Sequence, residues 1–77
     1  MSADRFDEAM REFTSRRPFR PFTIVLITGN RLEVDYPSAL ASREGAAAFL
    51  GPGGIPVLFD HEGVSEVVGD LMGKSGD

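Results

Sequence analysis

The single histidine of the chain lies among acidic residues. His61 stands between Asp60 and Glu62, a combination whose chemistry would be metal ligation or general-base catalysis. A metal site needs three or four ligands that converge on one ion, and adjacent residues of a turn rarely do so. We therefore interpret His61 as an exposed turn residue and predict no metal site around it.

Three further patterns resemble reactive or phosphate-binding sites but lack a necessary part. A serine nucleophile needs a partnered base, and this chain offers one histidine to its serines. Glu33 and Asp35 would form a carboxylate pair on one strand, which a solvated strand face explains as well. The glycine-rich segment 51–54 lacks the following Lys-Ser/Thr pair of a phosphate-binding loop. We therefore predict a chain that is not an enzyme and that holds no cofactor.

The composition of the chain bears on where in the cell the protein is expected. The 77 residues contain no cysteine, which excludes disulfides and thiolate metal sites and suits a reducing environment. No stretch approaches the roughly 18–20 apolar residues that a membrane span needs. The first residues carry Asp4, Asp7 and Glu8 rather than the apolar block of a signal peptide. We expect a cytoplasmic protein that makes no membrane contact.

One segment combines positive charge with aromatic rings. Residues 16–22, named here the arginine connector, interleave arginines with two phenylalanines, and two prolines hold the backbone extended. Such a segment can bind phosphates and stack on bases, or clamp an acidic partner. Alternatively, both rings anchor the core and the arginines pair with acidic strands of the same domain. The candidate binding surface consists of Arg16, Arg17, Phe19 and Arg20.

The charge of the chain is unevenly distributed. The net charge is −4, yet residues 1–31 hold six arginines and four acidic residues, whereas residues 32–77 hold two basic and eight acidic residues. An acidic chain is poorly suited to nucleic acid, because the phosphate backbone repels it. The asymmetry suits head-to-tail packing, and a core this small favours self-association because an oligomer hides more apolar area.

The first half of the chain has regular periodicities. Residues 4–15 carry apolar side chains at the spacing of a helix that buries one face. Residues 22–28 are apolar on both faces, which indicates a central strand. The pair Gly29-Asn30 is typical of a two-residue hairpin turn with positive φ at the glycine. Residues 31–36 alternate between apolar and charged side chains, and a proline ends that strand.

The second half is less regular. Residues 38–50 favour a helix by alanine content, but Arg43-Glu44-Gly45 would break it, so helix and strand both stay open. Residues 55–59 indicate a strand that Pro56 places at a sheet edge. Residues 64–71 form either a last strand or a short helix. Turns are expected at residues 51–54 and 60–63, and a disordered tail at residues 74–77.

These elements predict an α+β, mainly β, fold. A single domain over residues 1–73 would place an N-terminal helix before about five short antiparallel strands, in a strongly bent sheet or a partly open barrel. The apolar faces predict a buried core that comprises Phe13, Phe22, Ile24, Leu26, Val34, Leu58 and Val67.

Two resemblances accompany these patterns. Residues 17–24, Arg-Pro-Phe-Arg-Pro-Phe-Thr-Ile, resemble a group of small uncharacterised bacterial proteins in which an Arg-Pro-Phe-x-Pro-Phe element follows a short helix. The likeness covers residues 16–37; it implies a helix-plus-sheet domain with strands at 46–50 and 55–59, and implies no activity. Residues 26–31 are similar to the first hairpin of Sm-like proteins. The Asp-x-x-x-Asn and Arg-Gly elements of their RNA site are absent, so this likeness implies shape alone.

The sequence thus favours binding over catalysis. We expect a non-catalytic protein-interaction module, with another protein or a second copy of itself as partner and self-association into a homo-oligomer. The alternative is a weak RNA- or single-strand-binding module of Sm-like shape that uses the arginine connector.

Overall fold

The chain begins with a helix that packs on the core through one face. In the computed structural model, which describes residues 1–69, α1 spans Ala3–Ser15. The Ser2 hydroxyl caps it by accepting a hydrogen bond from the backbone N–H of Arg5 at 3.2 Å. Phe6 and Met10, one turn apart, are fully buried, as the apolar spacing predicts.

The first sheet contains the predicted central strand. β1 (Phe22–Leu26) lies between β2 (Arg31–Val34) and β6 (Val64–Gly69), and both pairings are antiparallel. The strand alternative for residues 64–69 is therefore the one observed. The remainder of that expected element, the domain boundary at residue 73 and the expected tail at 74–77 lie outside the described residues.

The hairpin between β1 and β2 is longer than the predicted two-residue turn. The N–H of Gly29 donates to the Leu26 carbonyl at 2.9 Å, and the Leu26 N–H donates to the Asn30 carbonyl at 2.8 Å. This is a three-residue loop closed by a glycine in the left-handed region, a common alternative to the two-residue turn. The prediction of a positive φ at Gly29 is confirmed, since φ is 97°.

Residues 38–50, which the sequence leaves open, form strands. The second sheet has the order β3 (Leu40–Arg43), β4 (Ala46–Leu50), β5 (Pro56–Asp60). Glu44 and Gly45 both have positive φ, 52° and 83°, which is the conformation of a two-residue hairpin turn. Sheet pairing on both sides of β4 thus overrides the helix propensity of its alanines.

A short 3₁₀ turn at Pro37–Ala39 separates β2 from β3, and residues 1–69 form six strands instead of about five. A further 3₁₀ turn at residues 52–54 joins β4 to β5, and one at residues 61–63 joins β5 to β6, as the turn residues predict. The predicted α+β class, a helix followed by small antiparallel sheets, is confirmed; the sheets do not close into a barrel.

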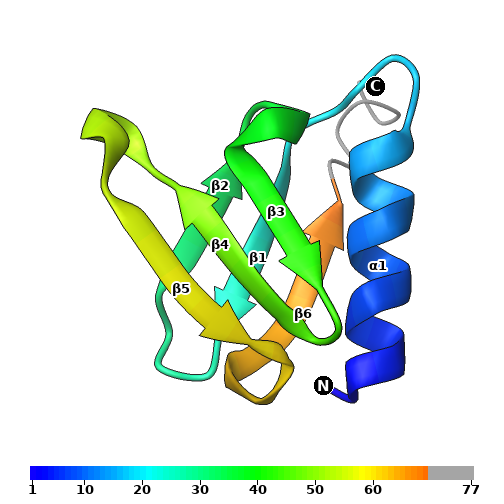
Figure 1. Ribbon diagram of the computed structural model, residues 1–77, viewed down its shortest axis with the longest axis vertical. Coiled ribbons are helices and arrows are strands. Elements are labelled where there is room, and N and C mark those ends of the chain that lie inside the picture. The colour runs from blue at the N-terminus through cyan, green and yellow to red at the C-terminus, as the bar shows by residue number, and fades with distance from the viewer. Residues whose placement is uncertain (70–77) are drawn as a thin grey trace.

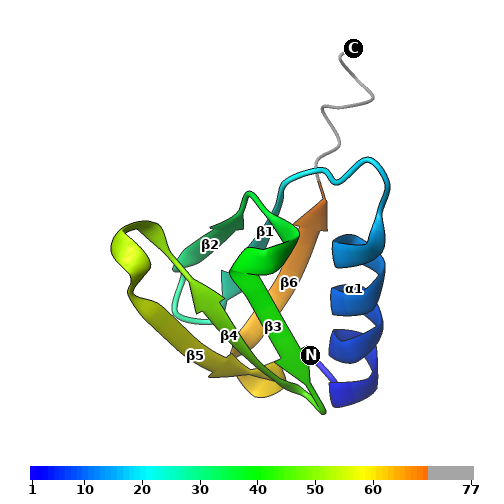
Figure 2. The same cartoon turned by 45° about the horizontal axis from the view of Figure 1, so that its top comes forward.

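The two sheets and the helix share one core. Figures 1 and 2 show α1 alongside β3 and β6, at one side of the two sheets, with β2 and β5 at the other side. Each layer contributes buried side chains to that core. They are Phe6, Met10, Phe22, Ile24, Val34, Leu40, Ala47, Phe49 and Val64.

Of the seven predicted core residues, three are buried, three are half-buried and one is exposed. Phe22, Ile24 and Val34 are buried, and Phe13, Leu26 and Val67 are half-buried against the same cluster. Leu58 is 78% exposed. It occupies the solvent-facing phase of β5, because its neighbours Val57 and Phe59 point inwards. A strand reverses every side chain when its phase shifts by one residue, and the apolar run of residues 57–59 does not specify that phase.

Polar contacts fix the start of α1 to the two turns at its end of the sheets. Asp7 accepts a hydrogen bond from the N–H of Gly45 at 2.8 Å, and the N–H of His61 donates to the Gly45 carbonyl at 2.7 Å. A Cβ on Gly45 would lie 3.0 Å from Cδ2 of His61 and 3.3 Å from Cβ of Ala3. Gly45 is therefore required both by its positive φ and by the close approach of its neighbours.

We predict that Gly45→Ala destabilises the protein more than Gly29→Ala does. Both glycines have positive φ, so each substitution should cost about 1 kcal/mol of backbone strain. A Cβ on Gly29 meets nothing within 4 Å, so Gly29→Ala is the matched control for strain alone. Crowding should add about 1 kcal/mol at Gly45, measured as the free energy of unfolding in urea. Equal losses would contradict tight packing of α1 against this turn.

Candidate functional site

The arginine connector is only in part a free surface. Arg17 and Arg20 are exposed. Arg16 is half-buried, because its guanidinium lies 4.4 Å from the centroid of the Phe13 ring and 3.6 Å from the Glu12 carboxylate. Within residues 1–69, none of the three arginines forms an ion pair with an acidic residue of a strand.

The aromatic rings of the connector belong to the core. Phe22 is buried, and its ring stacks on Phe13 with centroids 5.0 Å apart. Phe19 is half-buried and meets Phe22 nearly edge-on at 6.1 Å. Of the candidate binding residues, Arg17 and Arg20 thus project to solvent, whereas Arg16 and Phe19 also pack against the domain. Two exposed guanidiniums can attract an anion, but both rings of the connector pack against the domain, which disfavours stacking of a base on them.

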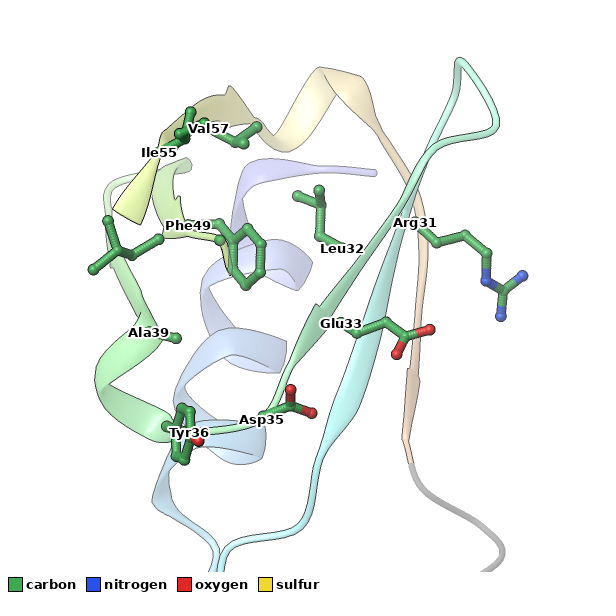
Figure 3. Close-up of a pocket in the computed structure, with 11 residues that line it drawn as sticks. Arg31, Leu32, Glu33, Asp35, Tyr36, Ala39, Phe49, Ile55 and Val57 are labelled. Atoms are coloured by element: carbon green, nitrogen blue, oxygen red, sulfur yellow. The ribbon is translucent and has the colours of Figure 1, made fainter. Parts of the chain in front are cut away.

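A groove on the opposite side of the molecule is a second candidate site. It lies between β2 and the end of the β4–β5 hairpin, away from α1, and has a volume of about 710 Å³ (Figure 3). Leu32, Phe49 and Val57 form its apolar floor. They come from β2, β4 and β5, so the floor exists only because the two sheets face each other across the core.

The rim of this groove exposes large apolar side chains. Tyr36 is 68% exposed, Ile55 is 67% exposed and Leu50 is 54% exposed. Tyr36 directly precedes the 3₁₀ turn that begins at Pro37, and Ile55 follows the glycine-rich turn at residues 52–54. Both therefore stand at junctions between a strand and a turn, Tyr36 just after β2 and Ile55 just before β5.

The pleat of β2 separates apolar from charged side chains along the groove. Figure 3 shows Leu32 directed into the groove, whereas Arg31 and Glu33 point away from it. These three consecutive residues all line the groove, so the backbone edge of β2 itself is part of the wall. The site therefore offers an apolar floor next to backbone groups that can form hydrogen bonds, which suits an extended peptide segment.

Sequence reasoning did not identify this groove. The alternation of residues 31–36 places Leu32 and Tyr36 on one strand face, and Pro56 indicates an edge strand at residues 55–59, but no local pattern predicts that these elements converge. The nearest sequence indication is the placement of Leu50 and Ile55 on either side of a glycine-rich turn, where apolar side chains tend to remain exposed.

His61 and Asp60 form local structural contacts. Asp60 accepts hydrogen bonds from the N–H groups of Glu62 and Gly63, which caps the 3₁₀ turn. His61 lies in that turn as predicted but is half-buried, with Nδ1 2.8 Å from the carbonyl oxygen of Met1. Over the described part of the chain, no three His, Cys, Asp or Glu side chains gather in a way that could hold a metal ion.

No helix among residues 1–69 is long and apolar enough to cross a membrane. Comparison of the chain with models of protein families, with curated proteins and with solved structures finds no match. The two resemblances described from the sequence therefore stay predictions.

We predict that Arg17→Ser/Arg20→Ser leaves stability almost unchanged. Both side chains are exposed and neither forms an ion pair among the described residues, so the free energy of unfolding should change by less than about 0.5 kcal/mol. Arg16→Ala should cost about 0.5–1 kcal/mol, because it removes the contact with the Phe13 ring. Urea melts measure both. A double variant that is less stable than Arg16→Ala would assign the exposed arginines to the scaffold.

Proposed function

We propose that this chain is a small non-catalytic protein-interaction module and that the groove along β2 receives an extended segment of a protein partner. The observation that carries the proposal is the combination of exposed Tyr36, Leu50 and Ile55 with an open strand edge. Apolar rims around an apolar floor are typical of protein-binding sites. The cysteine-free composition suits a module of the cytoplasm.

Binding by strand addition follows from the chemistry of the groove walls. A segment laid along β2 gains backbone hydrogen bonds from the strand edge, and every second side chain of the segment faces the floor. Leu32, Phe49 and Val57 favour apolar side chains at those positions. Charged residues at the outer side of β2 would select the intervening side chains of the partner.

The nucleic-acid alternative has less support. The net charge is −4, and Glu33 and Asp35 stand at the groove, so phosphate groups meet repulsion there. At the arginine connector, packing of the Phe19 and Phe22 rings into the core argues against base stacking. Titration with a fluorescent single-stranded RNA at two salt concentrations tests this alternative. Binding that falls steeply with salt and is lost in Arg17→Ser/Arg20→Ser would favour it over the groove.

The interaction module is tested with displayed random peptides of about ten residues, a length that spans a strand edge. Selection on the immobilised protein should enrich sequences that alternate apolar and polar residues. In titrations followed by amide chemical shifts, the bound peptide should perturb β2 and Ile55. Tyr36→Ser/Ile55→Ser should weaken binding at least tenfold, since both side chains line the groove.

Leu58→Ser is the matched control. Leu58 is at least as exposed as the two rim residues, and it does not line the groove. It should leave peptide affinity unchanged, and all three substitutions should leave the thermal transition nearly unchanged because the side chains are exposed. The proposal is wrong if no peptide is enriched, or if enriched peptides perturb the arginine connector in place of β2.

A further inference from the structure

We propose that the occupant of the groove is β2 of a second copy of this chain, paired antiparallel with Leu32 opposite Leu32 across a twofold axis. The inference rests on the proposed function, because it names the partner that the open strand edge accepts. It follows from which edges of the two sheets are open, how the backbone of β2 is oriented, and where its charges lie.

α1 covers two of the four outer strands, and a proline interrupts the edge of a third. α1 lies alongside the outer edges of β3 and β6 (Figures 1 and 2), where Asp7 bonds to the turn that follows β3 and the Phe13 ring packs against Gly69. β5 starts with Pro56, which has no N–H to donate. Within residues 1–69, β2 is therefore the outer strand whose edge neither a helix nor a proline blocks.

The hydrogen-bonding pattern between β1 and β2 determines which backbone groups of β2 face the open edge. The N–H of Leu26 donates to the carbonyl of Asn30, and bonds between antiparallel neighbours recur at every second residue. The N–H and C=O groups of Leu32 therefore face β1. Those of Arg31 and Glu33 face the open edge, where they are available to an added strand.

The charges of β2 select one register. With Leu32 opposite Leu32, Arg31 of each copy lies opposite Glu33 of the other, and both are residues whose backbone groups face the open edge. The same two residues thus exchange backbone hydrogen bonds and bring opposite charges together. The twofold axis repeats this pair, so a single complementary contact is used twice.

The neighbouring registers are less favourable. A shift that centres the pairing on Glu33 places two Glu33 carboxylates opposite each other, and one that centres it on Arg31 does the same with two guanidiniums. Like charges directly opposite in a ladder destabilise it. A shift by one residue would place Arg31, whose backbone groups face the open edge, opposite a residue whose backbone groups face β1, so the ladder of hydrogen bonds could not form. Charged residues commonly protect a strand edge from pairing with another chain, but the charges of β2 permit pairing in this one register.

The apolar part of the groove agrees with this register. Leu32 is half-buried in the single chain and points into a groove of about 710 Å³. In the paired arrangement the two Leu32 side chains lie on the same face of the joined sheet and cover each other. Ile55 and Val57 border the space that the second strand enters.

A charge-reversal cycle tests the proposal by sedimentation over roughly 10 µM to 1 mM, the range of weak interfaces. The unmodified chain should sediment as a concentration-dependent dimer. Arg31→Glu and Glu33→Arg should each weaken the dimer about tenfold, because each creates like-charge pairs twice. The double variant restores opposite charges and should recover the dimer, and an equimolar mixture of the two single variants should form a heterodimer.

Arg43→Glu is the control for net charge. Its side chain is 89% exposed, it lies on β3, and the substitution alters net charge as much as Arg31→Glu does. It should leave the dimer unchanged, and thermal melts should show that all variants fold. A monomer throughout the concentration range, or loss of the dimer that the double variant and the mixture do not recover, overturns the pairing. Peptides that still bind the groove of a monomeric chain would leave the proposed function standing.

Discussion

The structure depends on the burial of one helix face against one side of two small sheets. Phe6 and Met10 lose all contact with water there, and they join side chains from both sheets in one core. A chain of 77 residues has little apolar area to spare, so the position of this helix decides which parts of the sheets can be covered. The polar contacts of Asp7 and Gly45 fix the helix in that position.

Because α1 covers one side of the two sheets, their other side stays open. α1 shields the edges of β3 and β6, but no second helix is present among the described residues to lie between β2 and β5. The floor residues Leu32, Phe49 and Val57 consequently border a groove in place of a closed interior. The proposed binding function and the proposed pairing of β2 are both consequences of this asymmetry.

The sequence specifies the elements better than it specifies their arrangement. The helix, the central strand β1 and the turn at Gly29 follow from local periodicity and glycine chemistry, which act within a few residues. Residues 38–50 were ambiguous because alanines favour a helix, and only pairing on both sides of β4 makes them strands. The prediction that Leu58 is buried is wrong because residues 57–59 are all apolar, so their pattern does not indicate which of them face the core.

The groove could not be predicted from the sequence for the same reason. Its residues lie on three strands separated in sequence, and their convergence depends on how two sheets cross, which no local pattern encodes. The arginine connector, by contrast, is contiguous and therefore visible in the sequence. Arg17 and Arg20 are exposed, whereas Arg16 packs on Phe13, and the burial of the connector's rings depends on that same helix residue.

The most direct test of an open β2 edge is amide hydrogen exchange at three consecutive residues, resolved by NMR. In dilute protein the amide of Leu32, bonded to β1, should be protected, whereas those of Arg31 and Glu33 should exchange nearly as fast as in an unfolded chain. Raising the protein concentration should slow exchange at Arg31 and Glu33 and change Leu32 little. Strong protection of Arg31 and Glu33 at the highest dilution would mean that the edge is covered within a single chain, and would contradict the account.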